Sequence, residues 1–245
     1  MAARQGARQR LDDRNLFVTA AVLFALIVAV GFARTYYLKG LYATPPLASL
    51  LVHVHGIAMS AWVVLFATQV FLIRSHRVDL HRKVGVAGVG LACVVVVVGF
   101  FTAISAARNG SPSFPPNVIP LAFLAVPMFD LLMMVVLFGG AIWFRRRPAY
   151  HKRLMLLAAI NLLPPALARF PFPQLVALGP LFFFGVPTFL TLIALAYDTW
   201  RNGRLNGVFA LGAFLLIASY PVRLVVSGTD AWMRFATWLT TFAIV

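Results

Sequence analysis

Four of the five histidines lie between residues 53 and 83, and their spacing predicts a polar surface on one helix. His55, Trp62, Gln69 and His76 recur every seven residues, which is close to two turns of an α-helix, so they form a stripe on one face. In an apolar helix such a stripe must face protein or water rather than lipid. We therefore expect His55, Trp62 and Gln69 to line a ligand site. His53 points roughly 200° away from His55 on a regular helix, so only one of the two faces the interior, and the stripe favours His55.

Asp130 is the only carboxylate well inside an apolar stretch. An acid at the centre of a membrane helix costs about 2.5–3.5 kcal/mol on insertion scales, so it requires a partner. Arg169, Arg223 and a protonated His55 are the candidates, and the forked donors of arginine also suit a carboxylate or phosphate ligand. We expect these residues to line a common cavity in the outer half of the bundle. The alternatives are a purely structural ion pair or a neutral, protonated acid.

His81 and His151 form a second candidate site, because each follows a basic loop and precedes two basic residues. If the two helix starts meet, neutral imidazoles could bind the iron of haem b from both sides. The propionates would then meet the following basic side chains, which are Arg82, Lys83, Lys152 and Arg153. The alternative is that both histidines anchor helix ends at a surface of anionic lipid.

Composition places these residues in a membrane. The chain is 62% hydrophobic with a mean hydropathy of +0.90, whereas soluble domains are about 45–50% apolar. The formal net charge of +15 does not indicate nucleic acid, because the basic residues gather at the ends of apolar runs and so act in membrane orientation. Cys93 is the only cysteine, which excludes a disulfide within the chain.

The apolar runs predict an all-α, polytopic membrane bundle of seven transmembrane helices. Residues 1–14 form a basic cytoplasmic N-terminus, residues 15–228 the seven-helix domain, and residues 229–245 a C-terminal interfacial or bent helix. The expected spans cover residues 15–33, 47–73, 84–107, 118–144, 154–168, 175–197 and 207–226. The fifth is short because Pro164 and Pro165 interrupt it.

Basic residues and an internal repeat set the expected arrangement of these spans. Fifteen of the 21 Lys and Arg lie in the N-terminus and alternate loops, which predicts a bacterial inner-membrane protein with a cytoplasmic N-terminus and a periplasmic C-terminus. The segment FLIRSHRVDLHRKVG aligns with AIWFRRRPAYHKRLM at an offset of 70 residues. This match suggests a duplicated helical hairpin, spans 2–3 and 4–5. The alternative is coincidence between two basic loops.

Several motifs carry a resemblance to a known group of proteins. The pattern HG-x5-W-x6-Q, the loop ending LHRKVG and the segment YHKRLMLLAAINLLPPALAR resemble an uncharacterised family of bacterial seven-helix inner-membrane proteins. The resemblance covers roughly residues 50–170 and implies the fold, but no activity. The chain has a weaker likeness to b-type membrane cytochromes. It departs from their pattern because it lacks two well-placed histidine pairs within its spans.

Two classes of function remain open. The first is binding or transport of a small polar or anionic ligand at the outer-half cavity. The second is a membrane redox protein with haem b at His81 and His151, or a quinone near the His55 face. No lysine lies in the expected spans, which excludes a retinal Schiff base, and no P-loop, HExxH or GxSxG motif is present. The expected partners are membrane lipids and a small molecule, not nucleic acid.

Overall fold

The computed structural model describes residues 2–42, 44–47, 49–111, 114 and 118–243, with side chains from residue 15 onward. This part of the chain is helical and contains no strand. The long helices are α1 (Ala2–Phe32), α2 (Leu50–Arg74), α3 (Val78–Asn109), α5 (Ala125–Trp143), α6 (Pro148–Asn161), α10 (Gly185–Asn202) and α11 (Gly207–Ser227). The short ones are α4 (Pro120–Phe123), α7 (Pro164–Leu167), α8 (Pro173–Val176), α9 (Pro180–Phe183) and α12 (Asp230–Leu239), with single turns at Ala33–Tyr37, Lys39–Leu41 and Thr240–Phe242.

Six stretches within these residues are long and apolar enough to cross a membrane. They are Asn15–Tyr37, Leu50–Arg74, Val78–Asn109, Pro120–Trp143, Pro180–Asn202 and Gly207–Ser227. Their outward faces carry large apolar side chains, such as Val64, Val86 and Phe214, each about two-thirds exposed or more. Such a surface suits lipid rather than water. These are the features of a multi-pass membrane protein.

The expected count of seven spans is not confirmed. Residues 154–168 form α6 and α7, with a break between Asn161 and Pro164. Proline has no backbone N–H and its ring clashes with the preceding turn, so it ends α6, and at the first position of α7 it is favourable. The expected fifth span therefore corresponds to short helices and is not among the six long apolar stretches.

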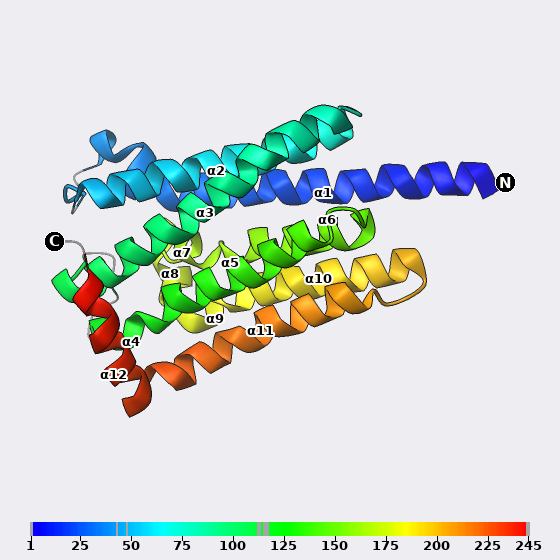
Figure 1. Ribbon diagram of the computed structural model, residues 1–245. Helices are drawn as coiled ribbons and strands as arrows, with labels where there is room; N and C mark the ends of the chain where they lie inside the picture. Colours follow the sequence, from blue (N-terminus) through cyan, green and yellow to red (C-terminus); the bar gives the residue numbers. More distant parts are fainter. Residues whose placement is uncertain (1, 43, 48, 112–113, 115–117, 244–245) are drawn as a thin grey trace.

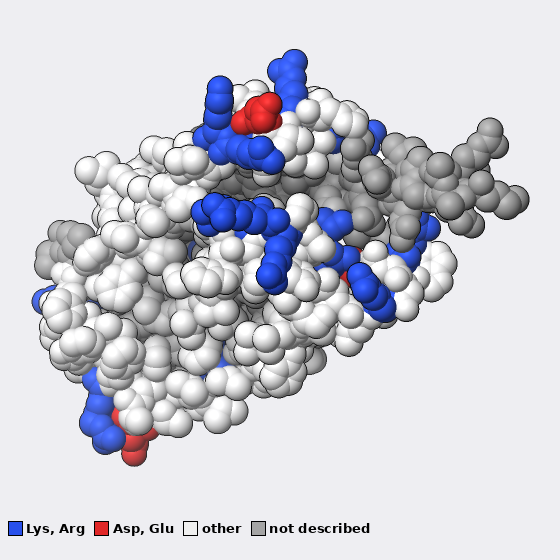
Figure 2. Space-filling view, turned by 45° about the vertical axis from the view of Figure 1, so that its right-hand side comes forward, with Lys and Arg blue, Asp and Glu red and all other residues white. Residues whose placement is uncertain are grey.

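The two ends of the bundle differ in charge. The N-terminus and the α2–α3, α5–α6 and α10–α11 turns lie at one end, while α12 and the C-terminus lie at the other (Figure 1). Lys and Arg side chains gather at the first end (Figure 2), where Arg74, Arg77, Arg147 and Arg204 are all exposed. The N-terminus and the loops that hold most of the basic residues in the sequence therefore lie together at one end of the fold.

Two helical hairpins lie within this arrangement. Helix α2 packs on α3, and α5 packs on α6. Helix α3 begins six residues earlier than expected, at Val78, so His81 lies in its first turn, just as His151 lies in the first turn of α6. This similarity does not by itself confirm a duplication, which stays a prediction.

Helix α6 lies at the centre of the bundle. It contacts α1, α5, α10 and α11, and Leu157 and Ala158 have no exposed surface. A helix that is apolar around most of its circumference must be covered on all sides. Its neighbours approach closely, since a Cβ atom added to Gly212 of α11 would lie 2.7 Å from a side-chain carbon of Leu157.

Gly31 marks the tightest helix contact and gives a direct test of the packing. A Cβ atom at Gly31 of α1 would lie 2.2 Å from the backbone oxygen of Ala166 in α7, and backbone cannot move aside as a flexible side chain can. Gly31→Ala should therefore lower the free energy of unfolding in detergent by about 1–3 kcal/mol, the usual range for overpacking.

Gly139→Ala is the matched control, because a Cβ atom there meets nothing within 4 Å. The control should be neutral, or stabilising by up to about 1 kcal/mol through helix propensity. Equal effects of the two substitutions would contradict the close contact between α1 and α7.

Candidate functional site

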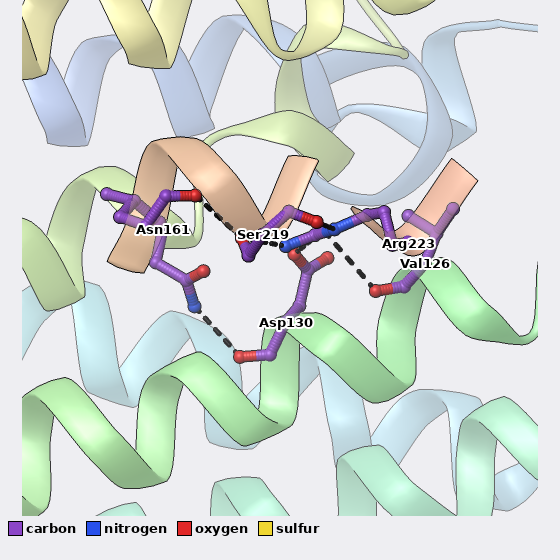
Figure 3. A network of polar contacts seen from close by, with 6 residues as sticks. Val126, Asp130, Asn161, Ser219 and Arg223 are labelled. Atoms are coloured by element: carbon purple, nitrogen blue, oxygen red, sulfur yellow. Dashed lines mark hydrogen bonds and ion pairs between the residues drawn. The ribbon is translucent and has the colours of Figure 1, made fainter. Parts of the chain in front are cut away.

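Asp130 of α5 and Arg223 of α11 form an ion pair inside the bundle (Figure 3). A guanidinium Nη1 atom donates to Asp130 Oδ1 at 2.5 Å. Asp130 is 7% exposed, and Arg223 has no exposed surface. Of the partners expected for Asp130, the structure thus selects Arg223, and it places both charges within stretches long enough to span a membrane.

The remaining donors of Arg223 are also directed to protein oxygens. Its Nε atom donates to the Ser219 carbonyl at 3.2 Å, and Nη2 donates to Ser219 Oγ at 3.0 Å. Nη1 reaches the Val126 carbonyl at 3.5 Å. Ser219 lies four residues before Arg223, one turn away on the same helix face. The guanidinium is therefore held in one orientation before any ligand is considered.

Aromatic rings lie against the parts of the Arg223 guanidinium that do not contact protein oxygen atoms. The Cζ atom of Arg223 lies 5.0 Å from the ring centre of Tyr220, 5.2 Å from that of Phe184 and 5.8 Å from that of Phe129. Tyr220 and Phe184 stack at 4.9 Å. Ring faces attract cations, so this wall stabilises the positive charge without adding a second negative charge.

Two polar atoms beside the pair have no hydrogen-bond partner in the described part of the chain. Asn161, at the end of α6, donates its amide to the Asp130 carbonyl at 2.8 Å, but its Oδ1 atom is unpartnered. The hydroxyl of Tyr220 is buried and unpartnered as well. Buried polar atoms are normally satisfied, so an acceptor and a hydroxyl remain available next to the charges.

His55 and Arg169 make contacts of their own. The His55 ring lies against Gly99 of α3, and its Nδ1 atom is buried without a partner among the described residues. Arg169, between α7 and α8, donates to the Pro165 carbonyl at 2.7 Å and lies over the ring of Phe32. In the described residues no hydrogen bond or ion pair joins these two side chains to Asp130 or Arg223, so a cavity shared by all four residues stays a prediction.

Trp62, the next residue of the stripe on α2, faces protein. Trp62 is 3% exposed and meets Phe138 of α5 edge to face, with ring centres 5.2 Å apart. Its indole nitrogen has no partner in the described chain. His53 is exposed while His55 is half-buried, which agrees with the choice of His55 as the inward residue.

Gln69 connects the stripe to the histidine pair. With its amide oriented to satisfy its neighbours, Gln69 donates to the Nδ1 atom and the carbonyl of His81 and accepts from the Gly85 N–H at 2.9 Å. The rings of His81 and His151 lie 6.3 Å apart, edge to face at 80°. The two histidines that the sequence comparison aligned are therefore neighbours in the fold.

These hydrogen bonds decide how well the pair fits haem iron. The His151 Nδ1 atom lies 2.9 Å from the Ala141 carbonyl, which can only accept, so Nδ1 carries the proton and Nε2 is a lone pair fit for a metal. At His81 the opposite holds, because Nδ1 accepts from Gln69 and the proton lies on Nε2. His81 in this arrangement does not fit as an Nε2 ligand of haem iron.

A second buried ion pair joins α6 to α10. Arg153 donates from Nε to Asp198 Oδ2 at 2.9 Å and from Nη2 to Oδ1 at 2.6 Å. Both residues are less than 7% exposed. Sequence reasoning missed this pair because it assigned Arg153 and Asp198 to loops. Asn161 and Ser219 were missed too, although a polar residue inside an apolar run was the available signal.

The Asp130–Arg223 pair should show strong energetic coupling. Asp130→Leu and Arg223→Met each leave one buried charge unpaired, so each should lower the free energy of unfolding by about 3–5 kcal/mol. The double variant removes both charges and should lose much less than the sum. Reversible denaturation in detergent micelles measures the cycle.

Asp79 and Arg82 supply the control cycle. They form an exposed pair at 3.9 Å on the first turn of α3, and such pairs contribute little. The control should show no measurable coupling. Additive effects of Asp130→Leu and Arg223→Met would show that the two charges do not stabilise each other.

Comparison with known proteins identified no relative of this chain. No family model, no curated protein and no solved structure matches the chain. Its function is accordingly argued from its own residues.

Proposed function

We propose that this protein binds a small anion at Arg223 and carries it across the bacterial inner membrane together with a proton on Asp130. The observation that carries the proposal is the position of the pair. An arginine with no exposed surface and its single carboxylate partner both lie within membrane-spanning stretches. Ionisable residues at such depth mark ligand or proton pathways in many membrane proteins.

The chemistry follows from charge balance. In the closed pair, the carboxylate of Asp130 neutralises Arg223. A proton added to Asp130 leaves the guanidinium without its counter-charge, and an anion then restores neutrality. Because this linkage is reciprocal, the anion favours protonated Asp130 and the proton favours the bound anion. With a singly charged anion, the loaded site has the same net charge as the empty one, which lowers the cost of crossing the bilayer.

The surroundings of the pair favour an anion with planar or tetrahedral oxygens. The guanidinium presents paired N–H groups, which match carboxylate and phosphate oxygens. The Tyr220 hydroxyl is available to donate to a ligand, and Asn161 Oδ1 to accept from one. The aromatic wall of Phe129, Phe184 and Tyr220 limits the size of what can bind.

The other expected ligand-binding residues take secondary roles in this proposal. Arg169 supplies a second positive charge, which we assign to the approach of the anion, and we assign the unpartnered Nδ1 atom of His55 to the same approach. Trp62 and Gln69 hold α2 against α5 and α3 through the contacts described above. The gathering of basic side chains at the end that carries the N-terminus supports a cytoplasmic N-terminus and a periplasmic C-terminus.

Proteoliposomes that contain a trapped pH-sensitive dye test the coupling. An inward gradient of succinate, lactate or inorganic phosphate should acidify the lumen of vesicles with wild-type protein beyond the leak of protein-free vesicles. Asp130→Asn removes the proton acceptor and should lower the initial rate at least about tenfold, a change equivalent to about 1.4 kcal/mol.

Asp79→Asn is the matched control, because it changes the same group at an exposed position outside the site. It should keep the wild-type rate. The proposal fails if none of the three anions carries protons with the wild-type protein, or if Asp130→Asn acidifies the lumen as fast as Asp79→Asn.

A further inference from the structure

A cleft opens at the basic end of the bundle. Its volume is about 610 Å³, and it lies between the start of α6 and the residues that join α10 to α11. One wall includes Arg147, Tyr150 and Lys152, and the other includes Arg204 and Asn206. The two walls are more than 50 residues apart in sequence, so the fold and not a single basic run assembles the cleft.

The buried Arg153–Asp198 pair forms the base of the cleft and fixes its width. Arg153 lines the cleft from α6, and its two bonds to Asp198 of α10 hold the two walls together. A further N–H of Arg153 donates to the Ala149 carbonyl. On the other wall, Asn202 donates to the Asp198 carbonyl at 2.7 Å. The walls are thus preorganised by buried polar contacts.

The turn that carries Arg204 is also defined. Gly203 ends α10 with φ of 63°, in the left-handed region that favours glycine. Asn206 then caps α11, its side chain accepting from the Phe209 N–H at 3.0 Å. These two constraints fix the backbone on each side of Arg204 at the edge of the cleft.

The charge inside the cleft is of one sign. Four of its lining residues are basic, and none of the described lining residues is acidic. Asp198, which does not line the cleft, balances the charge of Arg153, and the other three basic residues are Arg147, Lys152 and Arg204. Helices α6 and α11 both begin at the cleft, and helix N-termini add positive potential. Like charges gathered in a concave site focus the field, and a multivalent anion relieves their repulsion.

We propose that this cleft binds a phosphate group, supplied either by the headgroup of an anionic phospholipid or by free phosphate. The wall residues Arg147 and Arg204 would bind the phosphate oxygens with their forked donors, while Lys152, which also lies 5.2 Å from the ring of Phe17, adds a third charge. The site is separate from the Asp130–Arg223 pair and does not depend on the transport proposed for it.

The test compares two double variants in two arms. Arg147→Gln/Arg204→Gln removes two charges from the cleft, and Arg77→Gln/Lys83→Gln removes two exposed charges from the same end outside it. In the first arm, inorganic phosphate is titrated against the full-length protein in neutral detergent at constant ionic strength. In the second arm, native mass spectrometry counts phosphatidylglycerol retained by protein that was extracted from mixed phosphatidylglycerol–phosphatidylcholine vesicles.

Each result decides the proposal. If the source is free phosphate, the wild-type protein and the control bind it saturably, and the cleft variant binds at least about tenfold more weakly. If the source is a headgroup, free phosphate does not bind, and the cleft variant alone loses retained phosphatidylglycerol. The proposal is overturned if the cleft variant and the control behave alike in both arms, or if the wild-type protein binds neither probe.

Discussion

A charge inside a bilayer must be paired, and this constraint organises the interior of the protein. Helix α6 is buried on all sides, and polar contacts hold both of its ends: Arg153 pairs with Asp198 of α10, and Asn161 donates to the carbonyl of Asp130 on α5. Asp130 in turn binds Arg223 of α11. Three neighbours of the central helix are therefore connected by groups that cannot separate without exposing a charge to hydrocarbon.

The two ion pairs place different demands on their surroundings. The Arg153–Asp198 pair is bidentate, and Arg153 also donates an N–H to the Ala149 carbonyl. These contacts suit a structural role at the base of the cleft. At Asp130, the short bond to Arg223 is bordered by unpartnered atoms of Asn161 and Tyr220. Apolar residues of similar volume often replace a buried ion pair without loss of stability, so stability alone does not account for this pair. The protonation and anion binding that we propose would give the pair a further role.

The sequence was sufficient for the class of fold and for one contact of the site. The insertion cost of Asp130 required a partner, and Arg223 was among the three named; the seven-residue stripe correctly put Trp62 and Gln69 against protein. Height along a helix does not fix rotation about the bundle axis, however, and for this reason the sequence could not choose among His55, Arg169 and Arg223 as the partner that bonds to Asp130. Arg153 and Asp198 were overlooked because both lie near span ends, where charge normally meets water. The two prolines at 164–165 predicted that the helix before them would be short. They did not predict that this helix, α6, would be the central and most covered one.

The central claim is that Asp130 exchanges its bond to Arg223 for a proton when an anion binds. Difference infrared spectroscopy on protein carrying ¹³C-labelled aspartate observes this event directly. At constant pH, addition of the anion that drives proton uptake in vesicles should produce the band of a protonated aspartate carboxyl group, and the band should be missing in Asp130→Asn. If the anion binds and the wild-type spectrum shows no new protonated carboxyl group, Asp130 does not exchange partners and the account is wrong.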